Sequence, residues 1–245
     1  GGSRIDINVR NEDGYTALIW AAQEGHTEVV RVLLEHANDE TDINTALIFS
    51  AQEGHTEVVR VLLEHANSRI DINTLLILAA KNGYAEIASL LTESGADINA
   101  RDRFGNTPLI WATKNGHIEV VKVLLGHTNS ETDINTALMG AAQNGHVEIT
   151  VLLMSSGADI NTRDKDGNTP LILATKNGHA EVVKVLLGTT NSGIDINTAL
   201  ILAAQNGHIE IVQLLLDCCD QEGKSLIEFN AKSKSGYTAL TRAVQ

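Results

Sequence analysis

The sequence predicts a mainly α-helical solenoid in which short helix pairs repeat along the chain. Residues 22–38 recur without change at 51–67, so both copies are expected to meet the same surroundings. Two further markers repeat in phase, at intervals of 29 or 33 residues. One is a glycine after Asn or Glu: Gly25, Gly54, Gly83, Gly116, Gly145, Gly178 and Gly207. The other is a leucine, with a last interval of 40 residues: Leu18, Leu47, Leu76, Leu109, Leu138, Leu171, Leu200 and Leu240.

Each unit is expected to form two short helices. In the first unit, a helix runs from about Thr16, a typical capping residue, to Glu24. Gly25 ends it, because only glycine takes the left-handed conformation cheaply. The second helix follows His26 and has an apolar face made of Val29, Val30, Leu33 and Leu34. A single pair cannot bury these faces, whereas a stack of pairs can.

Three segments carry a family resemblance. "GNTPLIWATKNGHIEVVKVLL" (Gly105–Leu125) and "GNTPLILATKNGHAEVVKVLL" (Gly167–Leu187) contain Thr-Pro-Leu and Gly-His-x-Glu-Val-Val, and "SGADINARDRFGNTPL" (Ser94–Leu109) contains Gly-Ala-Asp-Ile-Asn. In these motifs the chain resembles the ankyrin-repeat family. The resemblance implies a right-handed solenoid with β-turn fingers, and a non-catalytic module that binds another protein through its concave first-helix face and its fingers. The family's His after Thr-Pro-Leu is replaced here, in most units by Ile.

The 29-residue units lack four loop residues that the 33-residue units have. We therefore predict fingers before units one, four, six and eight, and blunted loops before units two, three, five and seven. Residues 4–245 are interpreted as one domain of about seven full repeats and a carboxy-terminal half repeat, and residues 1–3 as an expression scar.

Composition and motifs disfavour several other classes of protein. The net charge of -13 makes nucleic acid an unexpected partner, and no apolar run approaches the length of a membrane span. Gly223-Lys224-Ser225 lacks the earlier glycine of a phosphate loop, because Cys218 stands there. The adjacent cysteines 218 and 219 suit a reducing, intracellular compartment. The sequence thus predicts no catalysis, no cofactor, no metal, a monomer, and a cytoplasmic or otherwise intracellular (or host-delivered) protein.

A column of histidines follows the helix-ending glycines. Its members are His26, His55, His117, His146, His179 and His208. Stacked helices lie about 8–10 Å apart, too far for two such side chains to share a zinc ion. We expect local hydrogen bonds at the turn between the two helices instead.

The partner-binding residues are expected on the first helices and fingers. They are Tyr15, Trp20, Glu24, Glu53, Lys81, Arg101, Arg103, Phe104, Trp111, Lys114, Arg163, Lys165 and Lys176. Trp20 and Trp111 share one position of the repeat, which is either an apolar seam between helices or a pair of exposed anchors. Acidic residues come early and basic residues later, which favours an acidic peptide or protein surface as partner. Merely solvated polar positions are the alternative.

Two asparagines, Asn99 and Asn161, follow a leucine eight residues earlier. The family resemblance implies β-hydroxylation as one role for them, and ties between neighbouring loops as the other. For the whole chain the alternative function is the recognition arm of a larger enzyme or secreted effector whose chemistry lies elsewhere. A binder of acidic cargo or nucleic acid through the lysines would show steeply salt-sensitive affinity.

Overall fold

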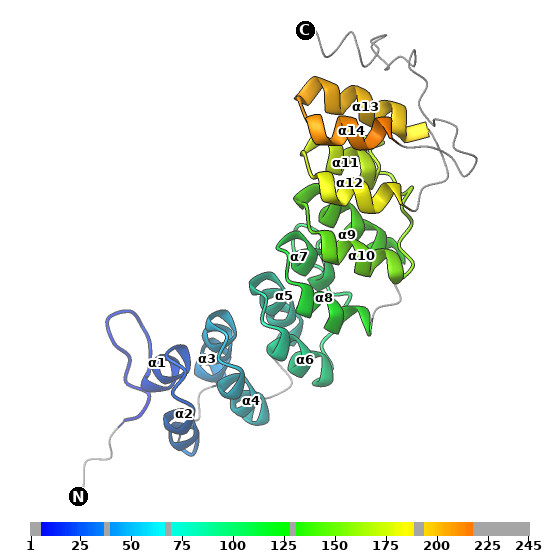
Figure 1. Ribbon diagram of the computed structural model, residues 1–245. Helices are drawn as coiled ribbons and strands as arrows, with labels where there is room; N and C mark the ends of the chain where they lie inside the picture. The colour runs from blue at the N-terminus through cyan, green and yellow to red at the C-terminus, as the bar shows by residue number, and fades with distance from the viewer. Residues whose placement is uncertain (1–5, 37–39, 67–69, 128–130, 189–193, 218–245) are drawn as a thin grey trace, which may run out of the picture. The chain divides into compact units, whose positions relative to one another are not determined.

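The computed structural model describes residues 6–36, 40–66, 70–127, 131–188 and 194–217, which form fourteen α-helices and no β-strand (Figure 1). As predicted, two helices make up each repeat. The first helices are α1 (Ala17–Gln23), α3 (Glu40–Glu53), α5 (Ile72–Asn82), α7 (Pro108–Lys114), α9 (Glu131–Asn144), α11 (Pro170–Lys176) and α13 (Ile194–Asn206). The second helices are α2 (Thr27–Leu34), α4 (Thr56–His65), α6 (Ala85–Glu93), α8 (Ile118–Leu125), α10 (Val147–Ser155), α12 (Ala180–Leu187) and α14 (Ile209–Leu216).

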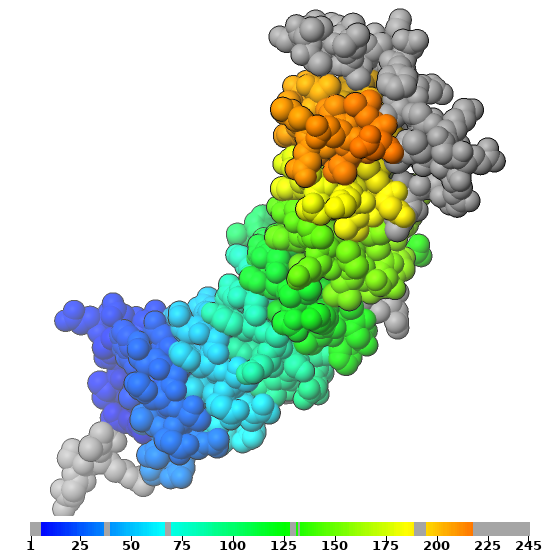
Figure 2. All heavy atoms as spheres, viewed as in Figure 1, coloured from blue at the N-terminus to red at the C-terminus, as the bar shows by residue number. Residues whose placement is uncertain are grey.

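The chain divides into two compact units, residues 1–128 and 129–245. In the first unit, α1, α3, α5 and α7 contact one another in order, and so do α2, α4, α6 and α8. In the second unit, α9, α11 and α13 form one such row, and α10, α12 and α14 the other. Within each unit the repeats follow one another in sequence order, as the colours of Figure 2 show. The assignment to a single domain stays a prediction.

Several sequence predictions lie outside the described residues. They concern the finger and half repeat after residue 217, the adjacent cysteines, the Gly223–Ser225 segment and residues 1–3.

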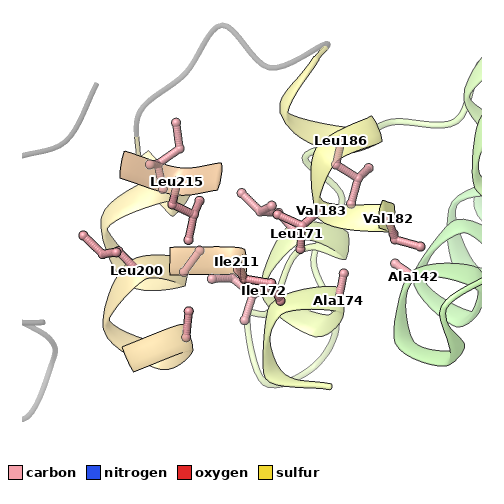
Figure 3. Close-up of a cluster of buried hydrophobic side chains, with 13 residues drawn as sticks. Ala142, Leu171, Ile172, Ala174, Val182, Val183, Leu186, Leu200, Ile211 and Leu215 are labelled. Atoms are coloured by element: carbon pink, nitrogen blue, oxygen red, sulfur yellow. The ribbon is translucent and has the colours of Figure 1, made fainter. Parts of the chain in front are cut away.

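The core of each unit is built from aliphatic side chains that seal one repeat against the next. Figure 3 shows this in the second unit, where Leu171 and Ile172 of α11 pack with Leu200 of α13 and Ile211 of α14. Small residues such as Ala174 and Ala203 are fully buried between the helices. Burial of this kind stabilises the stack by about 25 cal/mol per Å² of apolar surface.

One predicted core residue is exposed. Val29 was expected on the buried face of α2, yet 49% of its surface is accessible, whereas its counterpart one repeat later, Val58, is 1% accessible. Val58 is covered because a described repeat packs on that side of α4, and no described repeat covers the same side of α2. Burial at this position therefore comes from the neighbouring repeat and not from the helix itself.

The fingers lie where the sequence places them, before α1, α7 and α11. In the second of these, the Gly105 amide donates to Asp102 O at 2.9 Å and the Asp102 amide donates to Asn106 O at 3.1 Å, which closes a tight turn. Gly105 has a φ of 78°, which favours glycine. The finger prediction is confirmed within the described part of the chain.

The first helices that follow the blunted loops begin earlier than the sequence analysis expected. Helices α3 and α9 begin at Glu40 and Glu131 and are 14 residues long, whereas α7 and α11 are 7 residues long. Acidic residues in the first turn of the long helices complement the positive end of the helix dipole. Pro108 and Pro170 stop the short helices from extending, because proline disfavours a helical conformation in the residue before it.

The column histidines connect successive repeats, which the sequence prediction did not foresee. His117 Nε2 lies 3.0 Å from Lys81 O, and His179 Nε2 lies 3.0 Å from Gln143 O, so each ring reaches the end of the preceding first helix. The ring also covers the glycine there, since a Cβ built on Gly145 would lie 2.6 Å from Nδ1 of His179. These bonds hold the first helices in register along each unit.

Candidate functional site

The first-helix face, meaning the exposed side of the first helices together with the fingers, carries an aromatic cluster of Tyr15, Trp20 and Phe49 in the first unit. The rings of Tyr15 and Trp20 have centroids 5.8 Å apart and meet edge to face. The rings of Tyr15 and Phe49 do the same at 5.3 Å. Trp20 remains 40% exposed, so its side chain is not fully covered by the apolar contact between neighbouring helices. The cluster is a preformed apolar surface that a partner can cover.

A lysine–indole group, consisting of Lys81, Trp111 and Lys114, lies two repeats further on. The ammonium of Lys81 is 5.1 Å from the centroid of the Trp111 ring, and that of Lys114 is 5.6 Å away. Both distances fall within the range of cation–π attraction. The indole is half-buried, while both lysines are exposed. The group brings three predicted site residues together and presents positive charge on an apolar base.

The finger before α7 fixes the orientation of this indole. Nε1 of Trp111 donates to Asp102 Oδ2 at 2.8 Å, while the amides of Phe104 and Asn106 donate to Asp102 Oδ1 at 2.8 and 2.9 Å. Burial works to raise the pKa of Asp102, but these hydrogen bonds outweigh it and hold that pKa below its usual value. Lys114 Nζ donates to Asn106 Oδ1 at 3.0 Å, which ties the lysine to the same finger.

The corresponding finger of the second unit has the same frame without an indole. The Asp166 and Asn168 amides donate to Asp164 Oδ1, and the Asn168 side chain donates to Asp164 Oδ2 at 2.8 Å. Burial again works to raise the pKa of Asp164, and the hydrogen bonds, with Lys176 nearby, bring it below its usual value. Lys176 Nζ donates to Asn168 Oδ1 at 2.6 Å.

Two predicted site residues hold their own fingers together. Arg101 Nη1 donates to Gly105 O at 2.9 Å, and Arg163 Nη1 donates to Gly167 O at 2.8 Å. Arg163 also forms an ion pair with Asp195 of α13 at 3.3 Å. In the first unit Arg10 pairs in the same way with Asp42, which is almost fully buried. These arginines fasten a finger to its own turn and, for Arg10 and Arg163, to the next repeat.

The remaining predicted residues are exposed. At the tip of the second finger, Phe104 is 68% exposed and the Arg103 guanidinium stacks 4.7 Å from its centroid. Glu24 and Glu53 end α1 and α3 at the surface. Lys165 lies at the tip of the third finger. It lines a hollow of about 600 Å³ whose other wall is α9, including Asn135 and Met139.

The two asparagines proposed as hydroxylation sites are exposed. Among the described residues neither side chain makes a hydrogen bond, although the Asn99 amide donates to Asp97. Other asparagines hold the loops that precede these fingers: Asn73 Oδ1 at the start of α5 accepts from the Asp97 amide at 2.7 Å, and Asn135 Oδ1 in the first turns of α9 accepts from the Asp159 amide at 2.8 Å.

Four residues of the site escaped the sequence analysis. Phe49, Asp102, Asn106 and Asp42 were not among the residues expected there. The signal was present for Asp102, because Asp or Asn followed three residues later by Gly marks a turn capped by the side chain. The pairing of Arg10 with Asp42 had no local signal, since it spans 32 residues.

Other kinds of site are not found among the described residues. No three His, Cys, Asp or Glu side chains there are placed to hold a metal ion together. None of the fourteen helices has the length and apolarity that crossing a membrane requires.

Comparison with known proteins identifies the repeat. A family model described as ankyrin repeats (3 copies) matches residues 3–74, 66–137, 127–198 and 189–245. The human protein "Ankyrin repeat and SAM domain-containing protein 1A" is 56% identical over 41 residues, 17% of this chain and 4% of its own length. The chain thus spans only a small part of that relative.

Proposed function

Because the chain belongs to the ankyrin-repeat family, whose repeats are generally protein–protein interaction modules, we propose that it is a non-catalytic module that binds a partner protein through its first-helix face and fingers. The observation that carries the proposal is the exposure of large aromatic side chains there. Trp20 is 40% exposed and Phe104 is 68% exposed, and both belong to residue types enriched at protein interfaces.

The second helices offer a contrast. Their exposed positions combine short-range ion pairs, such as Glu119 with Lys122 at 2.7 Å, with aliphatic side chains such as Val32 and Ile209, and among the described residues the exposed large hydrophobic side chains there include no aromatic ring. Such pairs suit a solvated surface and contribute little to stability. The exposed aromatic side chains therefore support the first helices and fingers as the proposed partner surface.

A photo-crosslinking experiment tests this assignment. Benzoylphenylalanine is introduced at Glu24 or Phe104 on the first-helix face and, as matched control, at Glu119 on α8. In extract from the source cells, the first two positions should give discrete adducts of the same partner, identified by mass spectrometry. Adducts formed equally at Glu119, or there only, would contradict the proposal.

The alternative is that this chain is the recognition arm of a larger protein. The human relative is itself much longer than the stretch matched here, and its name records a second kind of domain. Binding by the first-helix face and fingers is common to both alternatives, and sequencing the complete reading frame separates them.

A modification of Asn99 and Asn161 stays a separate proposal. Their exposure and lack of side-chain hydrogen bonds among the described residues leave both side chains accessible to an enzyme. Intact-mass measurement after co-expression with an asparagine β-hydroxylase should show an increase of about 16 daltons per site, the mass of one oxygen atom. Unchanged mass would remove the proposal.

A further inference from the structure

The first-helix face of the first unit carries two different recognition surfaces. One is the aromatic cluster of Tyr15, Trp20 and Phe49, and the other is the lysine–indole group of Lys81, Trp111 and Lys114. Trp20 and Trp111 occupy the same position in the first and fourth repeats, so both surfaces belong to the same face. The first surface is apolar and uncharged, and the second is cationic.

The ammonium group of Lys81 is open to a ligand. Lys81 is exposed, and among the described residues the contact of its ammonium group is with the indole ring. Asp102, which accepts the Trp111 indole hydrogen bond, is ionised at neutral pH because its pKa lies below the usual value, so the two ammonium groups exceed this carboxylate by one charge. An anionic side chain placed over the ring would meet ammonium groups from two successive repeats. In a chain with a net charge of -13, such local positive charge favours an acidic ligand.

The distance between the two surfaces restricts the ligand further. Neighbouring packed helices lie about 8–10 Å apart, so three repeats span about 24–30 Å. An extended peptide advances about 3.3 Å per residue, so about seven to nine residues cover that distance.

We propose that the first unit recognises an extended protein segment in which an aromatic or large aliphatic residue and an acidic cluster are about seven to nine residues apart. The apolar residue covers Trp20, and the acidic cluster binds Lys81 and Lys114 over Trp111. This inference rests on the proposed function, since both surfaces lie on the first-helix face. It adds the chemistry and the spacing of the ligand.

Selection from a random peptide library tests both features together. A phage-displayed library of about 16 residues, long enough for the required spacing, is panned against the full chain. Enriched peptides should contain an apolar anchor and Asp or Glu at that spacing. Removing three residues between the apolar anchor and the acidic residues of the best synthetic peptide should weaken its binding by about tenfold or more, equivalent to about 1.4 kcal/mol.

Charge reversal supplies the matched comparison. Lys81→Glu should lower the affinity for that peptide by about tenfold, whereas Lys176→Glu in the second unit should change the affinity by less than about twofold. The chain has two tryptophans, so Trp20→Phe leaves Trp111 as the fluorescent reporter of the lysine–indole group, and Trp111→Phe leaves Trp20. Peptide binding should alter the emission of both variants.

The outcomes separate this inference from the proposed function. Peptides that perturb Trp20 but contain no acid, or that tolerate Lys81→Glu, overturn the inference and leave the proposed function standing. Peptides that perturb neither tryptophan, or a library without enrichment, count against both. If a single-stranded oligothymidine at comparable concentration displaces the peptide, the inference is overturned in favour of general polyanion binding.

Discussion

The fourth and sixth repeats share almost the same sequence but present different surfaces. Gly105–Leu125 and Gly167–Leu187 differ at two positions, Trp111 against Leu173 and Ile118 against Ala180. In both repeats a finger aspartate accepts three hydrogen bonds and a lysine donates to a finger asparagine. Only in the fourth repeat does an indole, that of Trp111, join these finger contacts. Lys81 of the third repeat lies beside that indole.

The two repeats separate the residues that build the fold from those that vary on its surface. The residues that the two repeats share are the buried core, the turn-forming aspartate and the helix-ending glycine. The indole and the finger tips, Arg103-Phe104 against Lys165-Asp166, point outward and differ. The same substitution at a shared position should therefore change stability by a similar amount in either repeat. A substitution at an outward position should have an effect that is specific to its own repeat.

The largest effect is expected at the glycine beneath the histidine ring. Gly145→Ala forces an L-residue to a φ of 77° and places its Cβ 2.6 Å from the His179 ring, which is held by a hydrogen bond. We expect a loss of about 2–4 kcal/mol in the free energy of unfolding, measured by urea denaturation with circular dichroism. Gly83→Ala, beneath His117, should behave alike.

Gly167→Ala is the matched control for that change. Its φ of 79° is equally unfavourable, but nothing lies within 4 Å of the added Cβ, so the loss should be about 1–2 kcal/mol. Equal losses for Gly145→Ala and Gly167→Ala would show that the ring contact adds nothing.

The next effect is expected at the finger aspartate. Asp102→Ala leaves the Phe104 and Asn106 amides and the Trp111 indole without their acceptor, which should cost about 1–3 kcal/mol and shift Trp111 emission to longer wavelength. Asp102→Asn should restore the two backbone hydrogen bonds, because Asn11 accepts the Asp13 and Tyr15 amides in the first finger, but it should leave the Trp111 indole without an acceptor, since the side-chain amide nitrogen is a donor. An unchanged emission of Asp102→Ala in the Trp20→Phe background would contradict the proposed role.

Acidification should release both fingers. The folded-state pKa values of Asp102 and Asp164 lie below the usual 3.8, so their contribution to stability is complete above that pH and is lost as the pH falls through the folded-state values. In Trp20→Phe, emission from Trp111 should stay constant from neutral pH to above 3.8 and change below it. In the Trp111→Phe background, Trp20 should lack that transition until the unit unfolds.

The smallest effect on stability is expected for exchanging the outward residues. Trp111→Leu makes the fourth repeat resemble the sixth and should lower the free energy of unfolding by about 1–2 kcal/mol, since it removes cation–π contacts, each contributing about 0.5–1 kcal/mol, and the indole hydrogen bond to Asp102. The reverse change, Leu173→Trp with Gln143→Lys, should give the second unit an acid-binding indole. Loss of cooperative unfolding in either variant would show that these positions belong to the scaffold.

Local patterns predicted the helix pairs, the fingers and the helix-ending glycines, because each depends on residues within one repeat. The longer α3 and α9 were not foreseen, since "ETDIN" contains no strong helix signal and becomes helical only because no finger or proline intervenes. The partners of Arg163 and His179 lie 32 and 36 residues away. Such contacts follow from stacking, which a single repeat does not encode.

The pairing of ring and glycine also explains how such a chain grows. His55 covers Gly25, Tyr84 covers Gly54 and His117 covers Gly83, so a six-membered phenol serves as well as an imidazole. Each joint is specified entirely by the two modules that meet there. A gene segment copied in tandem therefore yields a joint that already fits, and the identical stretches 22–38 and 51–67 have the form that such copying leaves.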